Sequence, residues 1–158
     1  MPKPTVIEAS SEIDAPPERV WAILVDLARY GEWNPFTPRV DATLRIGDPV
    51  VLHVAMKPGQ KLLVQREQCT ANDAAARELG WGMTMVAPFL LKANRVQRLE
   101  PLPGGRTRYY TSDTFSGLLV PLVMALYGAH IQRGFDGVAQ ALKDRAEQTI
   151  STRAAGPV

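Results

Sequence analysis

Asp113 is the residue of this chain whose type and position most clearly predict chemistry. In the segment from Arg106 to Phe115, Arg106 and Arg108 alternate with less polar residues, so both arginines should face water. The opposite face of this strand then carries Thr107, Tyr109, Thr111, Asp113 and Phe115. A carboxylate on an inner face needs a partner or a ligand, because burying it alone is costly. For Tyr109 and Phe115, a place in the core alone is an equal alternative.

Glu67 is the second carboxylate that could take part. Leu63, Gln65, Glu67 and Cys69 share one face of their strand, so Glu67 could enter the same interior. Paired acids can divide general acid and general base work between them. The alternative is an ion pair between Glu67 and an arginine at the sheet edge, and we favour that alternative.

Seven strands must position these side chains. A hydrophobic period of two and short turns rich in Gly, Pro, Asn and Asp predict an antiparallel meander. The predicted strands are Thr5–Ile13, Arg39–Arg45, Val50–Met56, Leu62–Thr70, Arg77–Met85, Lys92–Glu100 and Arg106–Phe115.

Three helices complete the pattern. Pro16 and Pro17 suit the first turn of a short helix after the first strand, and a second short helix covers Ala28 to Trp33. The last helix runs from about Leu118 to Glu147. Three glycines in it predict a kink or close packing, namely Gly128, Gly134 and Gly137. One long helix cannot cover a strongly curved sheet completely, so we expect a cavity for a small molecule between them.

The bulk properties indicate one α+β domain over residues 1–150, followed by a disordered tail over residues 151–158. The chain has 158 residues, 46% hydrophobic and 22% charged, with a formal net charge of +2. Basic residues are scattered, so we expect no nucleic-acid partner.

The single cysteine and the lack of a leader-like start favour the cytoplasm, and the longest apolar stretch is too short to span a membrane. We expect a monomer or a homodimer.

Several kinds of catalytic site find no support in the sequence. The two histidines, His53 and His130, have no metal-ligand spacing, and Cys69 has no partner cysteine. No nucleophile elbow, phosphate-binding loop or dinucleotide motif occurs. We therefore expect no metal and no cofactor, which leaves binding or proton-transfer chemistry.

Five short motifs follow one another between Val6 and Glu147. They are Val20-Trp21-x-x-Leu24-x-Asp26-x-x-x-Tyr30-x-x-Trp33-Asn34-Pro35-Phe36, Leu79-x-Trp81, Leu99-Glu100-Pro101-x-Pro103-Gly104-Gly105-x-Thr107, Phe115-Ser116-Gly117-Leu118-Leu119 and Leu142-Lys143-x-x-x-Glu147. Together they resemble the polyketide cyclase/dehydrase group of the SRPBCC superfamily, which includes START lipid-transfer domains and birch-pollen-allergen proteins. The resemblance implies a helix-grip fold, in which a curved seven-stranded antiparallel sheet wraps around a long C-terminal helix.

The resemblance also bears on Arg95 and Gln97. If Leu99 points inward, as the family pattern implies, Arg95 and Gln97 do so too, and Arg95 could then pair with Asp113 as a polar anchor for a ligand. Related sequences often carry a histidine and an aromatic or aliphatic residue at these two places. The opposite register stays open, and it would turn Asn94, Val96 and Arg98 inward instead.

The remaining candidate lining is mostly apolar. Methionines suit a pocket that accepts varied apolar shapes, and Tyr127 could bring a hydroxyl into it. For any one of these residues a place in the core is an alternative. The candidates are Trp33, Phe36, Met56, Trp81, Met83, Leu119, Val123 and Tyr127.

Two functions fit these residues. We favour the binding or transport of a small hydrophobic molecule, such as a lipid. The alternative is a cyclase or dehydratase acting on an aromatic or polyketide substrate, with Asp113, Glu67, Arg95 or Tyr109 as acid–base or carbonyl-polarising groups.

Overall fold

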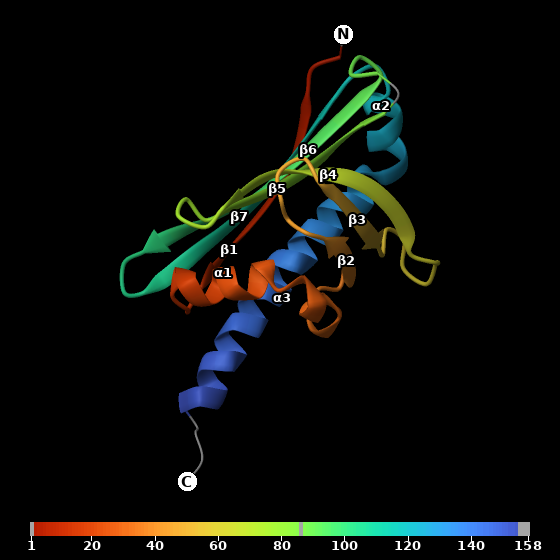
Figure 1. Ribbon diagram of the computed structural model, residues 1–158. Helices are drawn as coiled ribbons and strands as arrows, with labels where there is room; N and C mark the ends of the chain where they lie inside the picture. Colours follow the sequence, from red (N-terminus) through yellow and green to blue (C-terminus); the bar gives the residue numbers. More distant parts are fainter. Residues whose placement is uncertain (1, 86, 155–158) are drawn as a thin grey trace.

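A curved antiparallel sheet grips a long C-terminal helix (Figure 1). The computed structural model describes residues 2–85 and 87–154, with side chains described as far as residue 148. The strands are β1 (Thr5–Ile13), β2 (Arg39–Ala42), β3 (Pro49–Val54), β4 (Leu63–Asp73), β5 (Glu78–Met85), β6 (Leu91–Leu102) and β7 (Arg106–Ser116). The helices are α1 (Pro17–Val25), the 3₁₀ helix η1 (Leu27–Glu32), α2 (Val120–Val123), the π-helical turn η2 (Met124–Gly128) and α3 (Ala129–Ala154).

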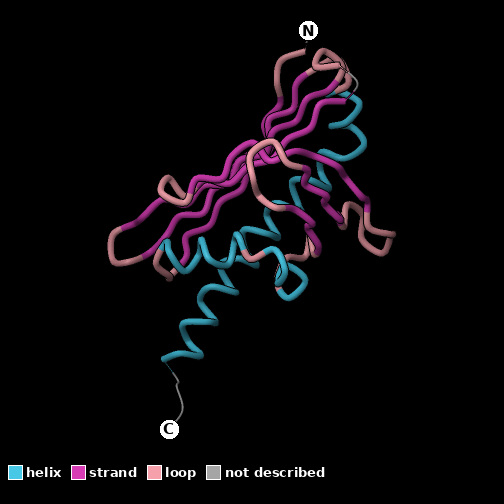
Figure 2. The backbone as a smooth tube through the Cα atoms, viewed as in Figure 1, coloured by secondary structure: helices cyan, strands magenta, loops and turns pink. Residues whose placement is uncertain are grey.

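The seven strands form one sheet in the order β1-β7-β6-β5-β4-β3-β2, and every neighbouring pair is antiparallel. The first strand therefore pairs with the last, while the other strands follow chain order. Figure 2 shows the strands bending past the helix, and α3 packs against β1 and α1. The predicted helix-grip α+β fold is confirmed.

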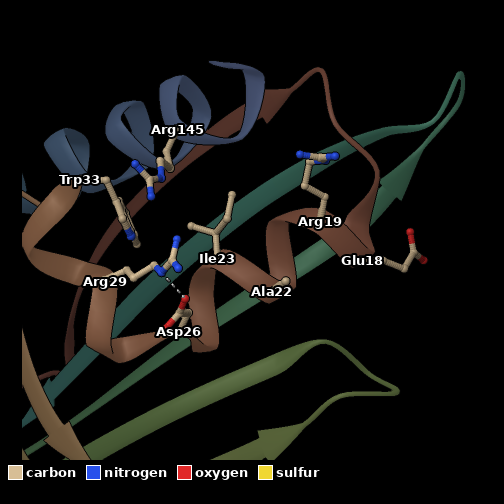
Figure 3. Close-up of a pocket in the computed structure, with 8 residues that line it drawn as sticks. All are labelled: Glu18, Arg19, Ala22, Ile23, Asp26, Arg29, Trp33 and Arg145. Atoms are coloured by element: carbon tan, nitrogen blue, oxygen red, sulfur yellow. Dashed lines mark ion pairs between the residues drawn. The ribbon is translucent and has the colours of Figure 1, made fainter. Parts of the chain in front are cut away.

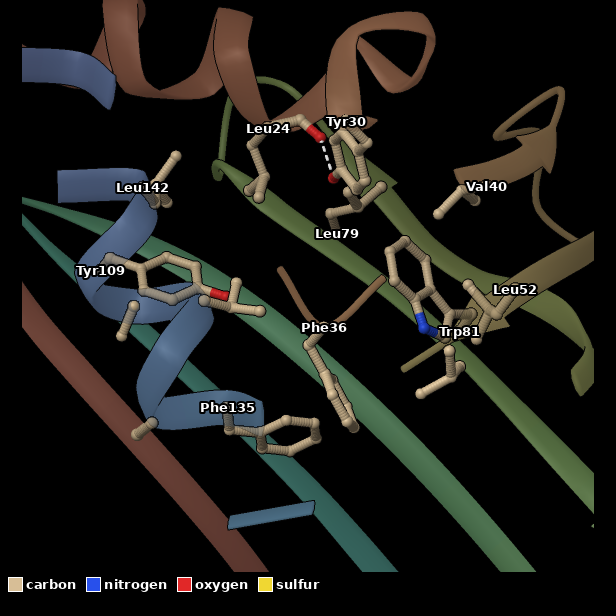
Figure 4. Close-up of a cluster of buried hydrophobic side chains, with 14 of the residues drawn as sticks. Leu24, Tyr30, Phe36, Val40, Leu52, Leu79, Trp81, Tyr109, Phe135 and Leu142 are labelled. Carbon is tan, nitrogen blue, oxygen red and sulfur yellow. Dashed lines mark hydrogen bonds between the residues drawn. The ribbon is translucent and has the colours of Figure 1, made fainter. Parts of the chain in front are cut away.

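The core lies between the concave face of the sheet and the helices. Leu142 and Phe135 of α3 belong to this core together with Tyr109 of β7 and Trp81 of β5 (Figure 4). Val20 and Leu24 of α1 are fully buried, which explains the helical spacing of the apolar residues there. The Tyr30 hydroxyl donates a hydrogen bond to the Leu24 carbonyl at 2.5 Å and fixes η1 against α1.

The C-terminal helix is not uniform. It was predicted as one helix from Leu118 to Glu147, but the π-helical turn η2 divides it and ends at Gly128. A Cβ on Gly134 would lie 2.3 Å from the Phe36 ring, so glycine is needed for this contact. Gly134 thus allows close packing, and Gly128 lies at the end of the π-helical turn.

Several predicted boundaries were wrong by a few residues. β2 ends at Ala42 rather than Arg45, because Leu44 adopts a left-handed backbone conformation with φ of 59°. β4 continues to Asp73, so the turn expected at Asn72-Asp73 comes later, where Arg77 has φ of 55°. The 151–158 segment, expected to be a disordered tail, is helical as far as Ala154. Residues 155–158 lie outside the described residues.

Among the described residues, no helix combines the length and the apolar character needed to cross a membrane.

Candidate functional site: a largely apolar cavity with a buried polar group

A cavity of about 390 Å³ lies between the concave face of the sheet and the C-terminal helix. This volume is in the range that suits a small organic ligand. Most of its lining is apolar and comes from the loop before β2, from five strands and from the C-terminal helix. The apolar lining residues that are buried or half-buried are Phe36, Leu52, Val54, Met56, Trp81, Met83, Leu91, Ala93, Phe115, Val123, Tyr127, Ile131 and Phe135.

Arg95 is the main cationic group inside this cavity. It is only 6% exposed, and its guanidinium carbon lies 4.2 Å from the centre of the Phe135 ring. Its Nε donates a hydrogen bond to the Thr111 hydroxyl at 3.1 Å, whereas its buried Nη2 has no hydrogen-bond partner. The inward register of Arg95 is therefore the observed one, and the opposite register is wrong, since Arg98 on the same strand is exposed.

Asp113 stands directly opposite Arg95 in the register of β6 and β7. Both residues line the cavity, but no ion pair within 4.0 Å joins them, so the predicted direct contact is absent between these two described side chains. The Asp113 Oδ1 is buried without a hydrogen-bond partner. Burial raises the pKa of Asp113 to about 6, and the charge of Arg95 opposes that rise.

Glu67 also lines the cavity, from β4. Among the described residues it forms no ion pair, so the favoured expectation of an ion pair at the sheet edge was wrong. Burial raises the pKa of Glu67 to about 8, the negative charge of Asp113 raises it further, and Arg95 opposes both. Near neutral pH, Glu67 therefore holds a proton while Asp113 is mostly ionised.

Three predicted site residues are buried behind the cavity lining rather than in it. The Tyr109 hydroxyl donates a hydrogen bond to Gln97 Oε1 at 2.7 Å, and both side chains are almost completely buried. Burial raises the pKa of Tyr109, and this favours its neutral form. Thr111 accepts the bond from Arg95. Thr111 therefore supports Arg95, Tyr109 and Gln97 pair with each other, and none of the three lines the cavity.

Trp33 and Leu119 also lie outside the cavity, although both were predicted to line it. Trp33 follows η1, and the centres of its ring and the Tyr30 ring are 5.0 Å apart in an edge contact. It borders a separate hollow with Arg29 and Arg145, between α1 and α3 (Figure 3). Leu119 packs against the core near the loop before β6, where its backbone N–H bonds to the Leu90 carbonyl.

His130, whose direction the sequence left open, borders another hollow of about 250 Å³ with Arg133. Among the described residues, no group of three or more His, Cys, Asp or Glu side chains could hold a metal ion.

The sequence prediction assigned Phe135 to the core and missed its place at the site. Val123, Tyr127, Ile131 and Phe135 follow one another at intervals of four and all line the cavity. The helical period that indicated a buried stripe therefore also identified the cavity face of the helix. Nothing in that pattern separates a buried residue from one that borders a hollow.

The sequence matches the family described as polyketide cyclase/dehydrase and lipid transport over residues 4–147, and the chain belongs to this family. It matches no curated protein.

Solved structures share the fold at low sequence identity. The Zhui aromatase/cyclase from Streptomyces sp. R1128 is 22% identical with a TM-score of 0.78, covering 99% of this chain and 100% of its own. A norcoclaurine synthase from Thalictrum flavum is 12% identical with a TM-score of 0.70, covering 94% and 97%. A START superfamily protein from Mycobacterium smegmatis is 18% identical with a TM-score of 0.67, covering 91% and 98%. The resemblance to the polyketide cyclase/dehydrase group is confirmed by the family match, and these structures share the helix-grip fold.

Proposed function

We propose that this protein binds, and in the cell carries, a small and largely apolar molecule with a polar end that can accept one hydrogen bond and donate another. The cavity supports this proposal by its volume and its apolar lining. We place the protein in the cytoplasm, as the lone thiol Cys69 indicates.

The unpartnered polar atoms inside the cavity carry the argument. Arg95 Nη2 can donate a hydrogen bond and Asp113 Oδ1 can accept one, and both are buried without a partner. Leaving such groups unpaired costs free energy, so a ligand that satisfies both is favoured. A carbonyl, carboxylate or phenolate oxygen suits Arg95, and a hydroxyl suits Asp113.

Binding can be tested with 1-anilinonaphthalene-8-sulfonate, an aromatic anion whose fluorescence rises when it leaves water. We expect a single class of site, and Arg95→Met should weaken the affinity about tenfold or more, because a charge-assisted hydrogen bond is lost. Arg98→Met is the matched control, since Arg98 lies on the same strand but is exposed and paired with Glu78. Equal affinities in the two variants would contradict the proposal.

The second candidate is an acid–base enzyme that closes or dehydrates a polyketide. The observation that favours it is the pair of carboxyl groups whose pKa values are raised by different amounts, to about 6 for Asp113 and about 8 for Glu67. Asp113 would accept a proton from the carbon between two carbonyls, with Arg95 stabilising the enolate oxygen. The enolate carbon would then add to a second carbonyl of the chain to form the ring bond, and the oxygen of that carbonyl would take the Glu67 proton and become a hydroxyl. For dehydration, Asp113 would remove the proton from the carbon beside a hydroxyl, and a C=C bond would form as that hydroxyl leaves. Glu67 would give its proton to this hydroxyl, which leaves as water.

This candidate is tested by incubating the protein with a synthetic poly-β-ketone thioester and separating the products by chromatography. Catalysis predicts an aromatic product that is lost in both Asp113→Asn and Glu67→Gln. Arg98→Met should keep full activity. If none of the proteins accelerates ring closure while the dye still binds, the enzyme candidate fails and ligand binding stands.

A further inference from the structure

At the mouth of the cavity, several apolar side chains are exposed to water. The cavity opens where exposed residues line it, at the start of β4 and the end of β5. These residues are Leu63, Val64, Arg66 and Met85. Val123 and Tyr127 of the C-terminal helix line the same cavity, and they are only half-buried.

Further apolar side chains extend this mouth along the helix. Phe89 is 54% exposed and Leu122 is 57% exposed. The Leu118 backbone N–H bonds to the Phe89 carbonyl at 2.9 Å, so the loop before β6 touches the entry to α2 (Figure 1). Leu118 just before α2, Leu122 in α2 and Leu126 in η2 are also exposed, each by more than half. We define the apolar rim as Leu63, Val64, Met85, Phe89, Leu118, Leu122 and Leu126, which are seven of the ten large hydrophobic side chains exposed in the described part of the chain.

The segments that carry the rim hold basic residues and no acidic ones. The rim lies on three segments, residues 55–66, 83–93 and 116–133, and these contain no Asp or Glu. All 16 acidic residues of the chain lie elsewhere, although the whole chain has a net charge of only +2. The basic residues of the three segments are Lys57, Lys61, Arg66, Lys92 and Arg133.

We propose that the apolar rim, together with these basic residues, docks on a membrane surface that contains anionic lipids. Exposed leucine and phenylalanine side chains can enter the boundary between headgroups and acyl chains, while lysine and arginine meet lipid phosphates. Large apolar side chains exposed in such numbers around an opening mark an interaction site. The rim supplies the apolar side chains, and the three segments that carry it supply the basic ones.

An acidic protein would also match the charges, but the position of the rim favours a membrane. The rim surrounds the mouth of an apolar cavity, so an apolar ligand could pass between the bilayer and the cavity without crossing water. This last argument rests on the proposed function, whereas the exposure and the charge of the rim do not.

The test uses the full chain and sedimentation with vesicles. Vesicles of phosphatidylcholine mixed with phosphatidylglycerol should bind the protein, and vesicles of phosphatidylcholine alone should bind it more weakly. Leu122→Glu should weaken binding about tenfold or more, because a charge cannot enter the apolar layer. Ile46→Glu should not, although Ile46 is 69% exposed, because it lies in the turn before β3 and outside the rim.

A second pair of variants tests the electrostatic part. Lys61→Glu should weaken binding to the anionic vesicles about fivefold or more, whereas Arg45→Glu, which changes an exposed charge outside the three segments, should not. Salt should weaken the binding of the unaltered protein.

Several results would overturn the proposal. They are no vesicle binding in a protein that still binds the dye, equal binding to both kinds of vesicle, or equal losses in Leu122→Glu and Ile46→Glu. Capture of an acidic protein through the rim without vesicle binding would assign the surface to a protein partner. A dimer broken by Leu122→Glu, again without vesicle binding, would assign it to a second copy. Loss of dye binding with intact vesicle binding would instead contradict only the proposed function.

Discussion

Arg95 and Asp113 face each other across β6 and β7, yet each keeps one buried polar atom without a hydrogen-bond partner. A hydrogen bond between them would satisfy both atoms within the protein and leave neither for a ligand. Their separation instead leaves a donor and an acceptor on a mostly apolar wall, where a ligand can use both.

The raised pKa of Glu67 predicts a pH-dependent cost to stability. Its folded-state pKa of about 8 exceeds its ordinary value of 4.5, so the folded protein holds this proton more tightly than the unfolded chain does. The protein is therefore not destabilised by Glu67 below about pH 4.5. Its free energy of unfolding falls as the pH rises from about 4.5 to about 8, and Glu67 causes no further loss above that. Urea unfolding at several pH values should therefore show Glu67→Gln gaining on the unaltered protein across this window.

Glu18 supplies the control for that experiment. It is exposed and bound by Arg77, and its pKa is lowered, chiefly by a backbone hydrogen bond. Glu18→Gln should therefore show no gain in relative stability as the pH rises. A Glu67→Gln variant that runs parallel to the unaltered protein at all pH values would show that Glu67 is not buried as described.

Tyr109 should matter for stability and not for the contacts of a ligand. Tyr109→Phe removes the bond to Gln97 Oε1 and leaves a buried acceptor unpaired, which should cost about 1–3 kcal/mol of the free energy of unfolding. Dye affinity should change less than twofold, because Tyr109 does not line the cavity. Tyr110→Phe, on the neighbouring position of β7, should leave both quantities unchanged. A large loss of affinity in Tyr109→Phe would place its hydroxyl in contact with the ligand.

Thr111 should act through Arg95. Thr111→Val leaves Arg95 Nε without its acceptor and frees the guanidinium to turn, so dye affinity should fall about tenfold, while Thr111→Ser should restore it. Thr107→Val is the matched control on the same face of β7. It removes a buried bond to the Ala15 carbonyl at 2.7 Å and should lower stability without lowering affinity. Equal affinity losses in both valine variants would indicate a general distortion of the strand.

Gly134 should tolerate no side chain. Gly134→Ala places a Cβ 2.3 Å from the buried Phe36 ring, which also packs edge-on against Phe135 at 6.0 Å. Thermal unfolding should show a loss of about 1–3 kcal/mol, and dye binding should change because Phe36 lines the cavity. Gly137→Ala meets only Pro35 at 3.7 Å and should instead gain about 0.5–1 kcal/mol from helix propensity. A neutral Gly134→Ala would mean that the Phe36 ring can move aside.

The sequence by itself determined the order of the elements and the inward face of most strands. Alternation along Arg106–Phe115 predicted the buried side of β7 correctly for Thr107, Tyr109 and Thr111, because each strand exposes successive side chains to opposite faces. Boundaries were less certain, since residues such as Leu44 adopt a left-handed conformation that no local pattern requires. The motifs from Val20 to Glu147 indicated the fold through their order.

Only the tertiary structure decided which inward side chains border empty space. Tyr109 and Phe115 lie on the same face of one strand, yet Phe115 lines the cavity while Tyr109 is packed behind it. That difference depends on where α3 lies over the sheet, which is set by long-range contacts such as Gly134 against Phe36. The separation of Arg95 from Asp113 is likewise a three-dimensional result, because strand register brings two residues opposite each other without fixing the direction of their terminal atoms.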